Sequence, residues 1–584
     1  MHAMINRLEC EVQWRYNRWR QTDLPPFMKQ ELHELKATEI MDRFYRNLPI
    51  GHDGVIGRVG VGTNRFNIYT VRRICQGLAD EIVARGFAAQ QRGVVVAYDS
   101  RYHSKGFAEQ ASLVLTNNNI KVYLFEKPAP SCELAFAVRY LHSAAGISVS
   151  AGTYPADYNG LHIYSENGAP VAAGYIERIS VNMEKLEDGL NVIAMHPEEA
   201  IASGKLVVIG SEIDEAYLEY LEQVPCSKES IQLMASSVRI VLTPLQGTGG
   251  ALASQALARL GFTEIHTVPE QQLPDLYFSR VRNPDPFRPE NLRLPYEVAG
   301  RVNADLVLAF NPEASAFSLS VKDRSGNYVL LSASQTAALM LNYMLEQKQR
   351  LLSLPANGIM LKSFMTSDLA ALIGARYGVR AAEVTNGFQG IGAAMAEYEK
   401  TGEHAYLFGF DEHGGCVTNG FVRDQDAIQA AILAAEMTAN LKSRGGTIFS
   451  ELQKLHQAYG SFAEDRASFV LGGTDWWQQA RIVLDRFCSE PPAMAGGLEI
   501  RRLYDYRTGE FRDQGRQRTC KIDASQVHAL KYLLEDGSWY GLRISPASPF
   551  LEVYVGTRQK DETAAKRRLL AIRSDVLYAL EAII

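Results

Sequence analysis

The chain has 584 residues, which is too long for one hydrophobic core and predicts roughly three to five domains. Hydrophobic residues make up 46% of the chain and charged residues 22%, as in ordinary globular proteins. The formal net charge of -6 excludes a strong general attraction to nucleic acid or to acidic membranes, so we expect neither as a partner.

The seven cysteines are scattered, odd in number and without a CxxC pair. Free thiols in a reducing compartment are the simplest interpretation of this pattern. The N-terminal residues do not show the pattern of a signal peptide, and no apolar run approaches the roughly 18 residues needed to cross a membrane. We therefore expect a cytoplasmic protein.

The first 46 residues are predicted to form a helical extension. Leu32, Leu35, Ile40 and Phe44 recur at helix-like intervals. Trp14 and Trp19 are expected to anchor the extension on the body of the protein. Membrane attachment is the less favoured alternative, because the charges of this segment are mixed in sign.

Beyond the extension, predicted strands and helices alternate as in α/β proteins. Residues 93–98 (GVVVAY) form a continuous apolar run, which is typical of a buried parallel strand. The other expected elements of the first unit are a helix at 71–85, a helix at 104–117, a strand at 121–125 and a strand at 145–150. The last of these strands runs into a loop at 151–160.

The alternation then repeats. Further strands are expected at 238–243, 304–310 and 405–410, with helices at 251–260, 334–348, 367–377 and 427–442. Residues 474–497 read as an irregular connector, and strands at 540–544 and 550–556 with a helix at 562–580 indicate a smaller α+β unit. The expected divisions are an extension at 1–46 and domains at 47–200, 201–325, 326–485 and 486–584.

Seven short motifs occur in an order and at spacings that belong to one known family. They are GTNRFN at 62–67, YTVR at 69–72, YDSR at 98–101, DYNG at 157–160, TPLQGTG at 243–249, FGFDE at 408–412 and FVRD at 421–424. On these motifs the chain resembles the α-D-phosphohexomutases, the phosphoglucomutase/phosphomannomutase family, over nearly its whole length. The resemblance implies three similar α/β domains and a smaller C-terminal α+β domain around a central cleft.

The resemblance also implies a reaction, the movement of phosphate between the 1- and 6-hydroxyls of a sugar through a phosphoserine. In this chain the family's nucleophile loop TASHNP reads SAGTYP, and the serine position falls on Gly152. Glycine has no side chain to phosphorylate. A one-residue slip of the loop would make Thr153 or Ser150 a substitute nucleophile.

The metal loop of the family, DPDADR, reads NPEASA at residues 311–316. Asn311, Glu313 and Ser315 stand where the family has aspartates, and Ala316 replaces the arginine. Magnesium serves active relatives, but hard cations prefer several carboxylate oxygens, so we expect no metal and no other cofactor here.

Several ligand-binding positions of the family are kept or exchanged. Asp411 and Glu412 fall on two sugar-binding glutamates, and His413 follows where the family has serine. Arg543 and Ser545 survive from the phosphate loop. Other positions carry a different residue from the family. Ile56 stands where the family has an arginine, Gln389 and His162 where it has lysines, and Gln246 where it has a histidine. Pro546 and Ala547 are replacements within the phosphate loop. Arg65 and Arg101 are the other candidates for contacts with a phosphate.

These losses predict a catalytically inactive homologue, a pseudoenzyme with a binding, regulatory or scaffolding role. Its partner would be an unidentified protein or a sugar-phosphate-like ligand. The alternative is an active phosphosugar mutase, an intramolecular phosphotransferase, with relocated catalytic groups. A third hypothesis is another acid/base reaction in the same cleft, carried by His52, Asp53, Asp411, Glu412 or His413.

Overall fold

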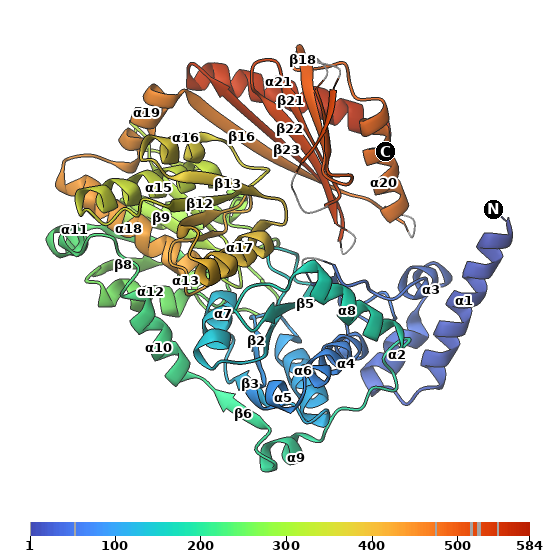
Figure 1. Ribbon diagram of the computed structural model, residues 1–584. Helices are drawn as coiled ribbons and strands as arrows, with labels where there is room; N and C mark the ends of the chain where they lie inside the picture. The colour runs from blue at the N-terminus through green and yellow to red at the C-terminus, as the bar shows by residue number, and fades with distance from the viewer. Residues whose placement is uncertain (1, 52–53, 474–475, 514–517, 523–526, 546–547) are drawn as a thin grey trace.

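The computed structural model describes residues 2–51, 54–473, 476–513, 518–522, 527–545 and 548–584. It contains three α/β units and a C-terminal unit rich in strands (Figure 1). The predicted α/β fold class and four-part architecture are therefore confirmed. Within the described residues, no helix combines the length and the apolar character needed to span a membrane.

The N-terminal extension consists of helices α1 (His2–Gln21), α2 (Pro26–Glu34) and α3 (Ala37–Phe44). Trp19 is fully buried, and its ring meets the rings of Phe44 and Tyr69 edge-on, so its anchoring role is confirmed. Trp14 is 53% exposed, so its expected anchoring role is wrong. Trp14 and Trp19 are five positions apart on one α-helix of about 3.6 residues per turn, so their side chains point to different faces of the helix and cannot share one buried surface.

The first sheet has the strand order β1-β5-β4-β2-β3-β6, with β4, β2, β3 and β6 parallel. All five residues of β2 are buried, which explains the continuous apolar run at this point of the sequence. Its strands are β1 (Val55–Arg58), β2 (Val94–Tyr98), β3 (Val122–Phe125), β4 (Ala145–Val149), β5 (Tyr158–Ser165) and β6 (Leu206–Ile209). Its helices are α4 (Ile68–Ala84), α5 (Phe87–Arg92), α6 (Ser104–Asn117), α7 (Ser131–Tyr140), α8 (Ala173–Glu184) and α9 (Pro197–Ala202).

The second sheet has the order β11-β10-β9-β7-β8. Its strands are β7 (Arg239–Thr243), β8 (Glu264–Thr267), β9 (Leu306–Phe310), β10 (Phe317–Lys322) and β11 (Tyr328–Leu330). The accompanying helices are α10 (Ser211–Leu221), α11 (Lys228–Met234), η1 (Ala235–Ser237), α12 (Gly250–Arg259), α13 (Pro269–Gln272) and α14 (Pro289–Val302). The loop after β7 and the loop after β9 meet, because a Cβ at Gly247 would lie only 2.3 Å from the Cα of Pro312.

The third sheet has the order β13-β12-β14-β15. Its strands are β12 (Gly358–Ser363), β13 (Arg380–Val384), β14 (Ala405–Phe410) and β15 (Cys416–Val417), and its helices are α15 (Ala333–Arg350), α16 (Leu369–Arg376), α17 (Gly387–Thr401), α18 (Ala427–Ser443) and α19 (Ile448–Tyr459). The alanine-rich α18 is buried along most of its length and packs against α12, β9, β10 and α15. The second and third units therefore share one hydrophobic core.

The fourth sheet is antiparallel, in the order β16-β23-β22-β21-β18-β19-β20, and β17 pairs with β18 at its side. Its strands are β16 (Ser461–Val470), β17 (Met494–Ala495), β18 (Leu498–Asp505), β19 (Glu510–Asp513), β20 (Arg518–Lys521), β21 (Ala529–Leu534), β22 (Trp539–Ser545) and β23 (Ser548–Gln559). Helices α20 (Trp476–Ser489) and α21 (Glu562–Glu581) belong to this unit. In Figure 1 it lies above the first unit, in orange to red.

Two expected divisions differ from the sheets. β6 pairs with β3, so the first sheet extends beyond residue 200. β16 pairs with β23 from Ser461↔Gln559 to Val470↔Phe550, so the fourth sheet begins well before residue 485. The expected irregular connector contains α20. Strand pairing between distant segments leaves no local pattern, which is why the sequence does not reveal it.

Candidate functional site

The four units meet around a cleft with a cavity volume of about 560 Å³. All four units contribute lining residues. Those of the first unit include residues 151–155, His162 and Tyr164, and those of the second include Asp285, Asn311, Glu313 and Ser315. Those of the third include Asn386, Gln389, residues 411–413 and Asp424, and those of the fourth include Arg466, Arg543, Ser545, Phe550 and Glu552. Most of the sequence-predicted site residues are thus brought to one place.

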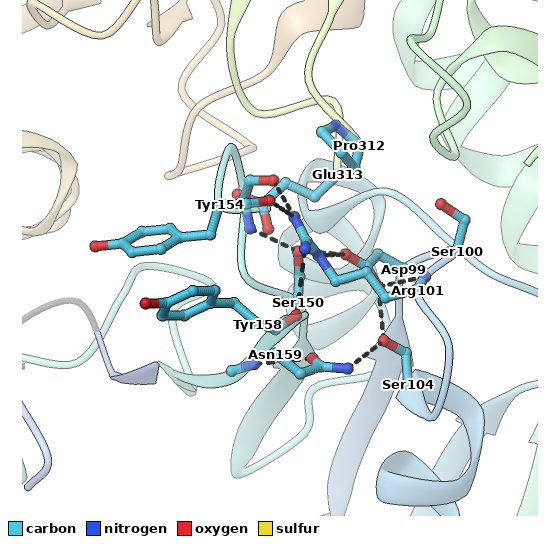
Figure 2. Close-up of polar contacts among 12 residues, drawn as sticks. Asp99, Ser100, Arg101, Ser104, Ser150, Tyr154, Tyr158, Asn159, Pro312 and Glu313 are labelled. Atoms are coloured by element: carbon cyan, nitrogen blue, oxygen red, sulfur yellow. Dashed lines mark hydrogen bonds and ion pairs between the residues drawn. The ribbon is translucent and has the colours of Figure 1, made fainter. Parts of the chain in front are cut away.

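Arg101 shapes the loop around Gly152, which the sequence resemblance places at the family's nucleophile position (Figure 2). Its Nη2 donates to the carbonyl oxygens of Gly152 at 2.7 Å and Tyr154 at 2.8 Å. Its Nη1 donates to those of Pro155 at 2.7 Å and Tyr158 at 3.2 Å. Arg101 is 1% exposed and does not line the cleft, in contrast to its predicted role in ligand binding. Its donors are taken up by loop carbonyls.

Ser150 belongs to the same network. Its Oγ donates to Asp99 Oδ2 at 2.8 Å and accepts from the backbone N–H of Gly152 at 3.0 Å. Asp99 also accepts from Arg101 Nε at 3.0 Å and from Ser104 Oγ at 2.7 Å. Burial raises the pKa of the Asp99 carboxyl, and the Arg101 guanidinium opposes this shift. Ser150 is fully buried, so its hydroxyl serves the shape of the loop and does not face a ligand.

Gly152 and Thr153 form the part of this loop that lines the cleft. Gly152 has a φ of +53°, in the left-handed region that favours glycine. A Cβ at this position would lie 3.4 Å from Glu313 Oε1. Of the two substitute nucleophiles named from the sequence, Thr153 reaches the cleft and Ser150 does not.

The Asn311 loop, which the sequence resemblance places at the family's metal position, is held by hydrogen bonds among its own residues. Asn311 Oδ1 accepts from the backbone N–H groups of Ser315 at 2.9 Å and Ala316 at 3.0 Å, while its Nδ2 donates to Ser315 Oγ at 2.8 Å. Ser315 Oγ in turn donates to Glu313 Oε1 at 2.9 Å. Because these oxygens already serve the loop and one carboxylate is present, the residues do not fit magnesium. Within the part of the chain that the structure describes, no group of three His, Cys, Asp or Glu side chains is placed to hold a metal ion.

Asp411 organises the loop that follows β14. Its Oδ1 accepts from the backbone N–H groups of His413 at 3.0 Å and Gly415 at 2.8 Å, and its Oδ2 accepts from Gln425 Nε2 at 3.0 Å. Burial raises the pKa of the Asp411 carboxyl to about 6. Asp411 therefore holds the loop that presents Glu412 and His413.

The fourth unit forms ion pairs with the second and third units at the cleft. We call the set Asp285, Glu412, His413, Arg466, Arg543 and Glu552 the charged cluster. Arg543 donates to Glu412 Oε1 at 3.0 Å. Arg466 donates to Asp285 Oδ2 at 2.9 Å and also contacts the His413 ring. The predicted residues Glu412, His413 and Arg543 are thus brought together.

The cluster favours ionised carboxylates. Burial opposes ionisation of Glu552, but His413, Arg466 and Arg543 hold its pKa below the usual value. Burial likewise opposes ionisation of Glu412, whose pKa is lowered by His413 and Arg543. Sequence reasoning missed Asp285, Arg466 and Glu552. Arg466 and Glu552 are brought to the cleft by the pairing of β16 with β23, which no local sequence pattern reports.

Two other predicted positions lie differently. Arg65 pairs with Asp42 and lines a separate hollow of about 330 Å³ between the extension and the first unit, so it is not brought to the cleft. Ser545 lies at the cleft beside Arg543. The predicted positions His52, Asp53, Pro546 and Ala547 lie outside the described residues.

The third unit also presents buried oxygen atoms. Asn386 Oδ1 and Gln389 Oε1 line the cleft without a hydrogen-bond partner among the described residues. Asp424 is buried at the same wall, where its Oδ2 accepts from Tyr164 Oη at 2.7 Å. Burial raises the pKa of the Asp424 carboxyl to about 6. The wall is therefore rich in hydrogen-bond acceptors.

Comparison with known families gives three matches in chain order. The model of phosphoglucomutase/phosphomannomutase alpha/beta/alpha domain I matches residues 48–189, that of domain II matches 215–326, and that of domain III matches 332–459. The domain I match contains the Gly152 loop, the domain II match contains the Asn311 loop, and the domain III match contains the Asp411 loop.

Relatives and solved structures agree with these matches. The chain is 28% identical to a phosphoglucomutase of Staphylococcus aureus strain MRSA252 over 90% of this chain and 92% of that protein. It is 28% identical to a phosphoglucomutase of Staphylococcus epidermidis, over 92% and 96%. A candidate phosphomannomutase from Thermus thermophilus has a similar fold, with a TM-score of 0.67 and 20% identity, over 91% of this chain and 99% of that one.

Proposed function

Because this chain belongs to the phosphoglucomutase/phosphomannomutase family of α-D-phosphohexomutases, we propose that its cleft binds a hexose-type ligand without transferring phosphate through a phosphoserine. One observation carries the proposal: Gly152, where the sequence resemblance places the family's serine, has a left-handed conformation, and its carbonyl oxygen accepts a hydrogen bond from Arg101. The self-contained hydrogen bonds of the Asn311 loop support it, since they use the oxygens that a cation would need.

A mutase that uses Thr153 as its nucleophile is the second candidate. The names of the relatives, phosphoglucomutase, support an intramolecular phosphotransferase role. The place of Thr153 on the cleft surface, next to Gly152, supports it as the substitute. Its hydroxyl would have to become a covalent phosphate carrier, which needs a neighbouring base and close positioning.

A coupled phosphoglucomutase assay separates the two candidates. Full-length protein is supplied with magnesium, glucose 1-phosphate and a trace of the bisphosphate. We expect no turnover above the rate without enzyme, either in the natural protein or in a Gly152→Ser variant. Turnover that disappears in Thr153→Ala would establish the second candidate, whereas turnover that survives Thr153→Ala would call for another nucleophile.

The cellular role extends this proposal. We propose a cytoplasmic location, which the scattered cysteines favour, and a regulatory or scaffolding role in which a protein partner reads the ligand-bound state. Cell fractionation tests the location. Cross-linking of the full chain to its protein partner, with and without ligand, tests the regulatory role. The partner is expected to bind either the ligand-bound or the ligand-free state, but not both.

A further inference from the structure

The polar groups that line the cleft indicate the chemical class of its ligand. We infer that this ligand is a protonated amino sugar without a phosphate group. The inference rests on the proposed binding of a hexose-type ligand and names its chemistry. Three features of the lining support it, namely its charge balance, its unpaired acceptors and its apolar side chains.

Carboxylates outnumber guanidiniums in the described lining. The carboxylates are Asp285, Glu313, Asp411, Glu412, Asp424 and Glu552, and the guanidiniums are Arg288, Arg466 and Arg543. Each arginine already has a carboxylate partner: Arg466 pairs with Asp285 at 2.9 Å, Arg543 with Glu412 at 3.0 Å and Arg288 with Glu290 at 3.2 Å. A phosphate dianion would have to compete for these guanidiniums beside like charges, which is unfavourable in a partly buried site.

Two carboxylates are held by uncharged donors. Glu313 accepts from Ser315 Oγ at 2.9 Å, and Asp424 accepts from Tyr164 Oη at 2.7 Å. Arg101 acts electrostatically on Glu313 from behind the loop, and His162 acts on Asp424. The guanidinium of Arg101 is already engaged by Asp99 and loop carbonyls, so an ammonium group of a ligand is the natural partner of Glu313.

The unpaired acceptors are an independent observation. Two buried side-chain atoms of the described lining, Asn386 Oδ1 and Gln389 Oε1, have no hydrogen-bond partner among the described residues, and both are oxygens. The orientation of the Gln389 amide is fixed because its Nε2 donates to the carbonyl oxygen of Val171, which leaves Oε1 as the atom that faces away from that bond. Buried acceptors need donors, which hydroxyl and ammonium groups supply and an ionised phosphate does not.

Apolar side chains also line the cleft. The rings of Tyr154 and Phe550 meet edge-on with centroids 5.4 Å apart, and Ile56 and Val171 are further apolar lining residues. A pyranose has this double character, with polar hydroxyls at its edge and C–H groups on its faces. A cavity of about 560 Å³ is also within the range of small-molecule sites and easily holds a monosaccharide.

Isothermal titration calorimetry of the full chain at neutral pH tests the inference, with glucosamine, glucose and glucose 1-phosphate as probes. We expect glucosamine to bind about tenfold more tightly than glucose, because a charge-assisted contact is worth about one factor of ten. Glucose 1-phosphate is expected to bind most weakly. Glu313→Gln should abolish the preference for glucosamine, so that the variant binds glucosamine and glucose with about equal affinity.

Glu219→Gln is the matched control, because Glu219 lies exposed on α10 outside the cleft and should change neither affinity. Asp424→Asn is the second variant if Glu313→Gln does not fold, and it should lower the glucosamine preference in the same way. Tightest binding of glucose 1-phosphate would overturn the inference and leave the proposed binding function standing. Equal affinities for glucosamine and glucose would overturn the ammonium site, and failure of all three probes to bind would overturn both proposals.

Discussion

The two sides of the cleft use their charged residues in different ways. On the side of the first unit, Arg101 and Asp99 are buried and directed at the nucleophile loop, mainly at its backbone and Ser150. On the side of the third and fourth units, Glu412, Arg466 and Arg543 pair with other side chains and line the cleft. The first arrangement fixes the shape of a loop through its backbone, whereas the second sets the charge of the cleft surface.

The largest expected effect comes from Arg101→Gln, which breaks the network behind the nucleophile loop. Asp99 would stay buried without its cationic partner, and loop carbonyls would lose their donors. We expect the free energy of unfolding to fall by about 3–5 kcal/mol. Urea unfolding followed by circular dichroism measures it. Arg58→Gln is the control, because Arg58 pairs with Asp157 at a side-chain exposure of 60%, and a loss of at most about 1 kcal/mol is expected. Equal losses would contradict the contrast between the two sides.

The second largest expected effect is a pH dependence of the protein's stability, which arises from Asp424 in the acceptor-rich wall of the cleft. The folded-state pKa of Asp424 is about 6, above the usual value of 3.8, so the folded state binds the proton more tightly than the unfolded state. Its contribution to stability is therefore lost as pH rises from about 4 through about 6. Asp424→Asn should raise the free energy of unfolding at pH 7 by up to about 3 kcal/mol and flatten this loss. Identical pH profiles for variant and natural protein would show that the carboxyl is not held in this environment.

A smaller effect is expected from Arg466→Gln in the charged cluster. The change leaves Asp285 without its guanidinium partner, takes one of two guanidiniums away from Glu552, and removes an ion pair between the second and fourth units. We expect the free energy of unfolding to fall by roughly 2 kcal/mol. The effect is smaller than for Arg101 because Arg466 is partly exposed, so water partly replaces the lost ion pair. Differential scanning calorimetry measures it. Arg293→Gln is the control, since that arginine pairs with Glu297 on the exposed face of α14. A loss as large as that of Arg101→Gln would show that both sides are equally structural.

The smallest effect is expected from Gly152→Ala. The left-handed φ of +53° strains any residue with a Cβ, and the cost is about 1–2 kcal/mol. Gly106→Ala is the matched control, because nothing lies within 4 Å of a Cβ there and the residue is in helix α6, where alanine is favoured by up to about 1 kcal/mol. Thermal melts of the two variants should therefore shift in opposite directions. An upward shift for both would mean that the loop does not need glycine for its conformation.

Much of the fold could be predicted because it is written in local patterns. The apolar run of β2 and the periodicity of α4 and α6 identify the first unit without knowledge of any contact. The fourth sheet was only partly predicted: β22 and β23 were found, but β16 was assigned to the third unit. Its partner lies about ninety residues further along the chain, and no local pattern reports such a pairing.

The candidate site shows the same division. The sequence by itself determined the family motifs, the glycine at position 152, the altered Asn311 loop and the acidic pair Asp411–Glu412. Only the tertiary structure decided that Arg101 is buried while Arg543 lines the cleft, and that Arg466 and Glu552 join the site. Residue type sets what chemistry a side chain can perform. Burial, direction and neighbours set whether it faces a ligand, and these depend on contacts between segments that are distant in the chain.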